Sequence, residues 1–178
     1  MNAFKDDLYR INGQRKWNIF KYFKLSKVQK FIYVFRKRQN AKSLISKKFL
    51  SYKLKKLSEK THIDISSEAV IGPGLMIAHK GFVIVGSATL GKNITLCSGA
   101  VIGNEWRGKR KGCPTIGNNV YVGPNATIVG KISIGDDVLV APNAFVNFDV
   151  PSHSIVIGNP GQIKHKDFAT EEYQTYTV

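Results

Sequence analysis

Four side chains carry the most obvious chemistry that this sequence offers: Asp64, His79, Cys97 and Cys113. An imidazole, with an unperturbed pKa of about 6.5, can take a proton from a hydroxyl group near neutral pH. Two cysteines are too few for a disulfide framework and fit a reducing cytoplasm. Cys97 is expected in the core, and no basic partner that would activate Cys113 is identifiable. What these groups can do depends on the elements that position them.

The second part of the chain has a period of six. Aliphatic residues recur at every sixth position, and ten of the thirteen are followed by a small residue. The leading aliphatic residues are Ile65, Ile71, Ile77, Ile84, Leu90, Leu96, Ile102, Ile116, Val122, Ile128, Ile134, Val140 and Val146. Such hexads predict a mainly β protein, a parallel β-helix in which three hexads form one triangular coil of about 18 residues. The alternative, an antiparallel sandwich, predicts alternation and turns every 8–12 residues or so.

Two interruptions break this period. One extra residue lies between Ile77 and Ile84, in the stretch that contains His79. A longer insert, residues 104–114, is polar and basic and carries Trp106. Irregular segments on a rigid scaffold are where function usually lies, so both interruptions are candidate site segments.

Several motifs together point to a family. They are Ile63-Asp64-Ile65, Ile71-Gly72-Pro73-Gly74, Ala78-His79, the insert before Ile116, Gly158-Asn159-Pro160 and, more weakly, residues 4–9. Residues 61–164 resemble the serine-acetyltransferase branch of the hexapeptide-repeat acyltransferases. The resemblance implies a left-handed β-helix, acetyl-CoA as acyl donor, His79 as general base and Asp64 as the carboxylate that orients it. A carboxylate on the second imidazole nitrogen fixes the tautomer and stabilises the imidazolium.

The expected acceptor site departs from that branch. True serine acetyltransferases carry an acidic residue where this chain has Ala78, and an Arg-His pair where it has Gly112-Cys113. In the family those groups hold the ammonium and carboxylate of serine, so their loss removes the charge complement for a zwitterion. The segment from Cys113 to Gly117 resembles capsule and exopolysaccharide relatives, including the colanic-acid acetyltransferase. Ala78, Trp106 and Cys113 are therefore expected to bind a sugar.

The resemblance also implies where acetyl-CoA binds, namely in a groove between neighbouring prisms of a homotrimer. Since residues 18 apart stack on successive coils, two Pro-Asn corners and the Gly158-Asn159-Pro160 corner should form one ladder. The expected cofactor-binding residues are Asn104, Gly123, Pro124, Asn125, Ala141, Pro142, Asn159 and Lys164. No metal is expected, because the histidines do not make the spaced ligand pair of the γ-carbonic anhydrases, which share the prism.

The charge divides the chain into parts. Residues 1–60 hold 18 lysines and arginines against Asp6, Asp7 and Glu59, which accounts for the whole net charge of +15. They contain no proline, so we expect a basic helical N-terminal segment over 1–60, a β-helix domain over 61–163 and a tail over 164–178. No apolar stretch is long enough to span a membrane, and charged residues within 1–10 exclude a signal core.

The basic segment admits three interpretations. It can assemble or cap trimers, including a dimer of trimers, or bind a membrane surface through its aromatic and basic residues. Nucleic-acid binding is permitted by the charge, but no motif accompanies it, and no nucleic-acid partner is expected. We expect a cytoplasmic protein, with peripheral contact at the inner face of the cytoplasmic membrane as a further arrangement.

The sequence thus predicts an acetyl-CoA-dependent O-acetyltransferase that modifies a sugar hydroxyl in surface-polysaccharide synthesis and acts negligibly on L-serine. Serine O-acetylation in cysteine biosynthesis is the alternative enzyme activity. A non-catalytic hexapeptide scaffold is the alternative from another class of protein, and the presence of both Asp64 and His79 disfavours it.

Overall fold

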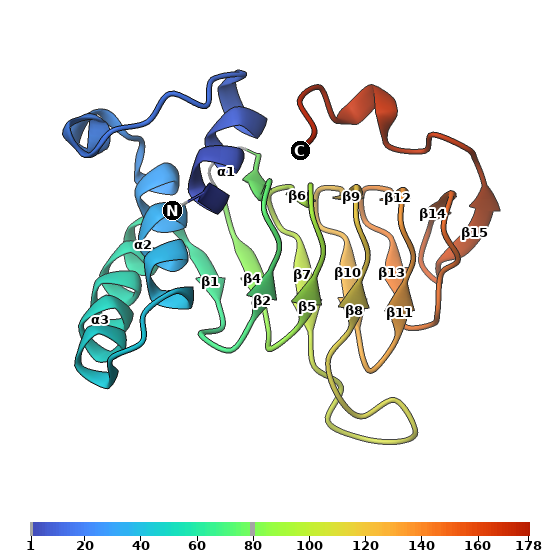
Figure 1. Ribbon diagram of the computed structural model, residues 1–178. Helices are drawn as coiled ribbons and strands as arrows, with labels where there is room; N and C mark the ends of the chain where they lie inside the picture. The colour runs from blue at the N-terminus through green and yellow to red at the C-terminus, as the bar shows by residue number, and fades with distance from the viewer. Residues whose placement is uncertain (1, 79–80) are drawn as a thin grey trace.

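The computed structural model describes residues 2–78 and 81–178, and most of the chain is a parallel β-helix with helices at one end (Figure 1). The first face consists of β1 (Ile63–Ile65), β4 (Val83–Val85), β7 (Val101–Gly103), β10 (Thr127–Val129) and β13 (Phe145–Val146). The second consists of β2 (Val70–Ile71), β5 (Thr89–Leu90), β8 (Thr115–Ile116) and β11 (Ser133–Ile134). The third consists of β3 (Met76–Ile77), β6 (Thr95–Leu96), β9 (Val120–Val122), β12 (Val138–Val140), β14 (Ser154–Ile157) and the antiparallel β15 (Gln162–His165). The predicted fold class is confirmed.

The leading aliphatic residues line the interior as predicted, with one exception. Ile84 is half-buried, whereas Val85 is 2% exposed and pairs with Ile65 on one side and Ile102 on the other. The prediction for Ile84 was wrong because the first interruption adds two residues, not one, and the next hexad is one residue shorter. Ile84 therefore faces outward, in register with Asp64.

The N-terminal segment is helical, as predicted. It contains α1 (Asn2–Asn12), the 3₁₀ helix η1 (Ile19–Lys24), α2 (Lys27–Gln39) and α3 (Leu44–Thr61). Ser26 and Gln29 form a reciprocal capping box that begins α2. His62, with a left-handed φ of 58°, ends α3 and turns the chain directly into β1. Among the described residues, no helix combines the length and apolar character needed to cross a membrane.

A buried ion pair attaches the helices to the first coil. The Arg36 guanidinium on α2 donates to both carboxylate oxygens of Asp7 on α1, at 2.8 and 2.9 Å. Arg36 also donates to the carbonyls of Ile71 and Gly72, and the backbone N–H of Leu75 donates to Asp7 at 2.7 Å. Burial raises the pKa of Asp7, and the contacts with Arg36 oppose that rise. The helical segment is thus a cap on the prism within one chain.

The C-terminal tail is a strap that runs back along the prism. Asp137 accepts hydrogen bonds from the N–H groups of Ala169 and Thr170 and from the Thr170 hydroxyl, at 2.9–3.0 Å. Val178 exchanges two hydrogen bonds with the side chain of Asn93, at 2.8 and 2.9 Å. The tail therefore spans the corner between the second and third faces over several coils.

We expect Asp137→Ala to release this strap. Burial alone would raise the pKa of Asp137, but hydrogen bonds from Thr170, His153 and Ala169 lower it below its ordinary value. The contribution to stability is therefore complete above the unfolded pKa of about 3.9 and is lost as the pH falls through the folded pKa. At neutral pH the substitution should reduce the free energy of unfolding by about 1–3 kcal/mol.

Limited proteolysis checks this expectation, because cleavage should become faster within residues 166–178. Asp136→Ala is the matched control. The Asp136 carboxylate lies on the same corner but accepts a hydrogen bond from the backbone N–H of Asn118, which is not part of the tail. Equal protease resistance of the Asp137 variant and the wild-type protein would contradict the assigned role.

Candidate active site

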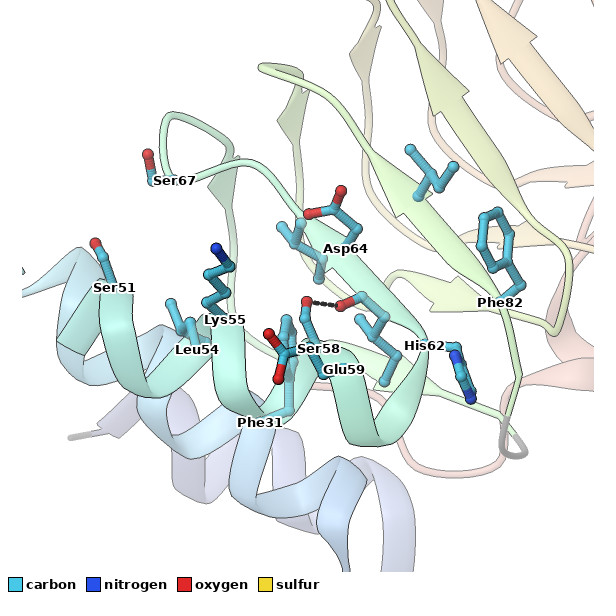
Figure 2. A pocket seen from close by; sticks show the side chains of 13 residues that line it. Phe31, Ser51, Leu54, Lys55, Ser58, Glu59, His62, Asp64, Ser67 and Phe82 are labelled. Atoms are coloured by element: carbon cyan, nitrogen blue, oxygen red, sulfur yellow. Dashed lines mark hydrogen bonds between the residues drawn. The ribbon is translucent and has the colours of Figure 1, made fainter.

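A pocket of about 460 Å³ lies between α3 and the outer surface of the first face, and Asp64 forms part of its wall. Figure 2 shows Lys55 and Glu59 of α3 on one side of this pocket and Phe82 on the other. The pocket thus combines charged groups of both signs with aromatic surface, an arrangement suited to a small polar molecule that carries an apolar part.

The direction of Asp64 follows from the strand that holds it. Ile63 and Ile65, on either side, are buried in the prism, so the alternation of a strand turns Asp64 outward. The Ser58 hydroxyl donates to the carbonyl of Ile63 and joins the end of α3 to the start of β1. The helix that lines the pocket and the strand that carries Asp64 are therefore one connected unit.

The predicted base, His79, lies outside the described residues, so its pairing with Asp64 stays a prediction. Ala78 ends the described segment before it, and its N–H donates to the carbonyl of Leu96 at 2.9 Å. Phe82 follows soon after it in the sequence and lines the pocket. Phe82, on the far side of the predicted base in the sequence, thus lines the same pocket as the predicted carboxylate, Asp64.

The predicted cofactor ladder exists as a stack of corners between the third and first faces. The N–H of Asn125 donates to the carbonyl of Ser98, and the N–H of Asn143 donates to the carbonyl of Pro124. Asn125 and Asn143 both have left-handed backbones, which asparagine tolerates well. The corners 123–125, 141–143 and 158–160 therefore follow the corner that contains Ala78, in the order expected. Their contact with acetyl-CoA stays a prediction.

The second interruption projects from the opposite edge of the first face. Figure 1 shows it as the long loop between β7 and β8. Glu105 and Gly112 close the loop with two backbone hydrogen bonds of 2.9 and 3.0 Å. Trp106 is 74% exposed, whereas the side-chain oxygen of Asn104 is buried without a hydrogen-bond partner among the described residues. Within one chain, these residues lie across the first face from the ladder.

The remaining site predictions fall in varied places. Cys113 is half-buried against the core, which leaves part of its side chain accessible. Lys164 is exposed on β15, paired with Ile155, and belongs to the third face rather than to the ladder. Cys97 is buried, as predicted, and its thiol donates to the Tyr121 hydroxyl at 3.1 Å. Burial raises the pKa of Cys97, which disfavours the reactive thiolate.

Sequence reasoning missed the contribution of α3 to the pocket. Lys55, Ser58 and Glu59 all line it, but the segment was interpreted only as a cap or a binding surface. One signal was present: Glu59 is the only acidic residue between positions 8 and 63. Among the described residues, no cluster of three or more histidine, cysteine or acidic side chains could hold a metal ion.

The comparisons with known proteins agree with this geometry. A family model described as "Bacterial transferase hexapeptide (six repeats)" matches residues 113–147. The structure of Neisseria gonorrhoeae serine acetyltransferase in complex with serine is similar, with a TM-score of 0.74 and 30% sequence identity. The match covers 91% of this chain and 67% of that chain. The chain belongs to the hexapeptide-repeat transferase family.

Curated members of the family extend this result. The serine acetyltransferase of Staphylococcus aureus (strain Mu50) is 37% identical over 108 residues, which are 60% of this chain and 51% of the relative. Serine acetyltransferase 2 of Arabidopsis thaliana is 36% identical over 109 residues, which are 61% of this chain and 34% of the relative. The chain thus spans about a third to a half of these relatives. They support the predicted serine-acetyltransferase resemblance, whereas the expected closeness to colanic-acid enzymes finds no support among them.

Proposed function

We propose that this hexapeptide-repeat transferase moves the acetyl group of acetyl-CoA onto a hydroxyl group, and that L-serine is the acceptor. The similarity to the Neisseria gonorrhoeae serine acetyltransferase carries this proposal, because it extends over both the helical cap and the prism. The Staphylococcus aureus and Arabidopsis thaliana relatives have the same named activity. The proposal therefore favours serine O-acetylation over the sugar acetylation expected from the sequence.

The chemistry assigns a role to each residue. His79 takes the acceptor hydroxyl proton as the oxygen attacks the thioester carbonyl, and Asp64 orients the imidazole and stabilises its charged form. When the tetrahedral intermediate collapses, the C–S bond breaks and the leaving thiolate takes the proton from the imidazolium. Acetyl-CoA would lie along the corners 123–125 and 141–143, where small residues let an extended chain approach the backbone. A prism edge alone does not enclose such a chain, so we expect a homotrimer with sites between subunits.

A saccharide hydroxyl is the second candidate acceptor, and the loop favours it. Gly112 has a φ of 133°, and a Cβ there would meet the Lys131 Cβ at 3.2 Å, so an arginine does not fit this position without strain. Ala78 and Cys113 likewise place no charge where the family binds serine. The exposed Trp106 offers an aromatic face suited to a sugar ring.

We expect L-serine to stimulate release of the CoA thiol, but with a kcat/KM lower than that of the Staphylococcus aureus enzyme by about tenfold or more. Each missing charge-assisted hydrogen bond forfeits roughly 1.5–3 kcal/mol. A thiol assay, with products identified by the mass gain of one acetyl group, measures this. Ala78→Asp should raise kcat/KM for serine by about tenfold, and Ser87→Asp, on another corner, serves as the control.

The same assay with a saccharide panel tests the second candidate. Acetylated saccharide without acetylated serine, with turnover reduced in Trp106→Ala, would replace serine by a sugar as the acceptor. Absence of acceptor-dependent thiol release with every compound would contradict the acetyltransferase proposal itself.

A further inference from the structure

Two phenylalanines project from the helical cap into solvent. Phe20 and Phe23 on η1 are 85% and 83% exposed. They are not on a loose segment, because Tyr22 between them packs on Tyr33 with ring centroids 5.2 Å apart, and Trp17 packs on the same ring at 5.7 Å. The base of η1 is thus fixed to the core, and its two phenyl rings are held outward.

A second apolar edge lies on α3. Leu44, Ile45, Phe49 and Tyr52 are exposed, and the spacing of the last three places them on one side of the helix. Lysines accompany them, since the ammonium of Lys53 lies 4.5 Å from the centroid of the Phe49 ring. Figure 1 shows η1 and α3 at the same end of the molecule, beyond β1.

The charge around these side chains is almost entirely positive. The only aspartate or glutamate between positions 8 and 63 is Glu59, which lines the pocket near the end of α3. Of the acids just before this stretch, Asp7 is buried against Arg36, and Asp6 lies 3.8 Å from Arg15. Lysines stand on both sides of the exposed phenylalanines, at positions 16, 21, 24, 27 and 30. This end of the cap therefore presents apolar side chains in a strongly positive field.

Three occupants differ in how they fit such a surface. A second copy of the chain would bring the same positive charge against it, which is repulsive. A nucleic acid would neutralise the charge, but the exposed Leu44 and Ile45 would gain nothing from stacking on bases. An anionic bilayer satisfies both features, because its headgroups attract lysines and its acyl region buries aromatic and aliphatic side chains.

We propose that the η1–α3 end of the cap docks on the surface of anionic lipid bilayers. Phe20 and Phe23 enter the interfacial region, and the surrounding lysines contact the lipid phosphates. Because α3 also lines the pocket through Lys55 and Glu59, docking holds the candidate active site one helix away from the lipid surface. The proposal is independent of the acceptor and of catalysis.

Co-sedimentation of the full chain with vesicles tests it. We expect binding to vesicles that mix phosphatidylglycerol with phosphatidylcholine, little binding to phosphatidylcholine alone, and weaker binding at high salt. Phe20→Ser combined with Phe23→Ser should weaken partitioning by about tenfold or more. Lys21→Gln and Lys24→Gln should each weaken it about fivefold. Phe168→Ser is the matched control, since Phe168 is also highly exposed but lies in the C-terminal tail.

Two results would overturn the proposal. One is a protein that stays in the supernatant with anionic vesicles, and the other is a Phe20/Phe23 variant that binds as the wild type does. In either case, tight binding of an RNA oligonucleotide, or self-association that depends on the same phenylalanines, would identify a different occupant. The vesicle assay contains no substrate. Its outcome therefore does not depend on whether the protein is an acetyltransferase.

Discussion

His79→Ala is expected to lose on the order of 10² to 10⁴ in turnover while the protein keeps its fold and its affinity for CoA. The substitution removes the group that takes the acceptor proton, and a hydroxyl group is a poor nucleophile without such a base. Steady-state thiol release measures turnover, and CoA binding by calorimetry measures affinity.

Asp64→Asn separates positioning from proton transfer. It should lose less turnover than His79→Ala, because the base remains while its orientation and charge stabilisation are impaired. Its pH profile should also shift, since the carboxylate favours the imidazolium. Near-normal turnover of His79→Ala would refute the mechanism, whatever Asp64→Asn does.

Arg36→Met should destabilise the protein by about 3–5 kcal/mol, because it leaves the carboxylate of Asp7 buried without its counter-charge. Asp7 is 0% exposed and Arg36 3% exposed. The substitution also removes the donors to the carbonyls of Ile71 and Gly72. For a chain of this size we expect the melting temperature to fall by roughly 6–20 °C, measured by circular dichroism.

Arg38→Met is the matched control for this prediction. Arg38 lies on the same helix and donates hydrogen bonds to the Ser51 hydroxyl and to the carbonyl of Ser67. Unlike those of Arg36, these hydrogen bonds are partly exposed to solvent. Its loss should cost about 1 kcal/mol or less. Asp7→Leu combined with Arg36→Met should recover part of the stability, since no buried charge then remains unpaired. Equal melting temperatures for the Arg36 and Arg38 variants would contradict the role of the ion pair.

The prism was predictable because its period is strict. Each coil repeats the same inward aliphatic position, so residues such as Leu96 and Val140 could be assigned to the core from spacing alone. The prediction failed at Ile84 because the insertion before it shifts the six-residue period. The residues on either side of Ile84 are both valines, which fit the interior equally well. At an interruption, the six-residue period cannot show which of several adjacent apolar residues points into the prism. The pairing of the strands shows it.

The candidate site was predictable only in part, because one wall belongs to the repetitive prism and the other to a helix outside the repeat. Asp64 and the ladder of corners lie on the prism, where position in the repeat determines location. Lys55 and Glu59 lie on α3, whose apolar residues do not form one clear stripe: Leu54 is buried, whereas Phe49 is exposed. The face that α3 turns to the prism is set by tertiary contacts, among them the bond from Ser58 to Ile63.

The strap formed by the tail changes how this repeat protein comes apart. A linear stack of coils can fray from either end, since each coil contacts only its neighbours. Here Val178 is bonded to Asn93 in an early coil, and the carbonyl of Tyr176 accepts from Arg10 of α1. Unfolding of the last coil would disturb these contacts with the first coils and with the cap. The two ends of the stack are therefore coupled through the tail. The protein should therefore unfold in one cooperative step rather than coil by coil.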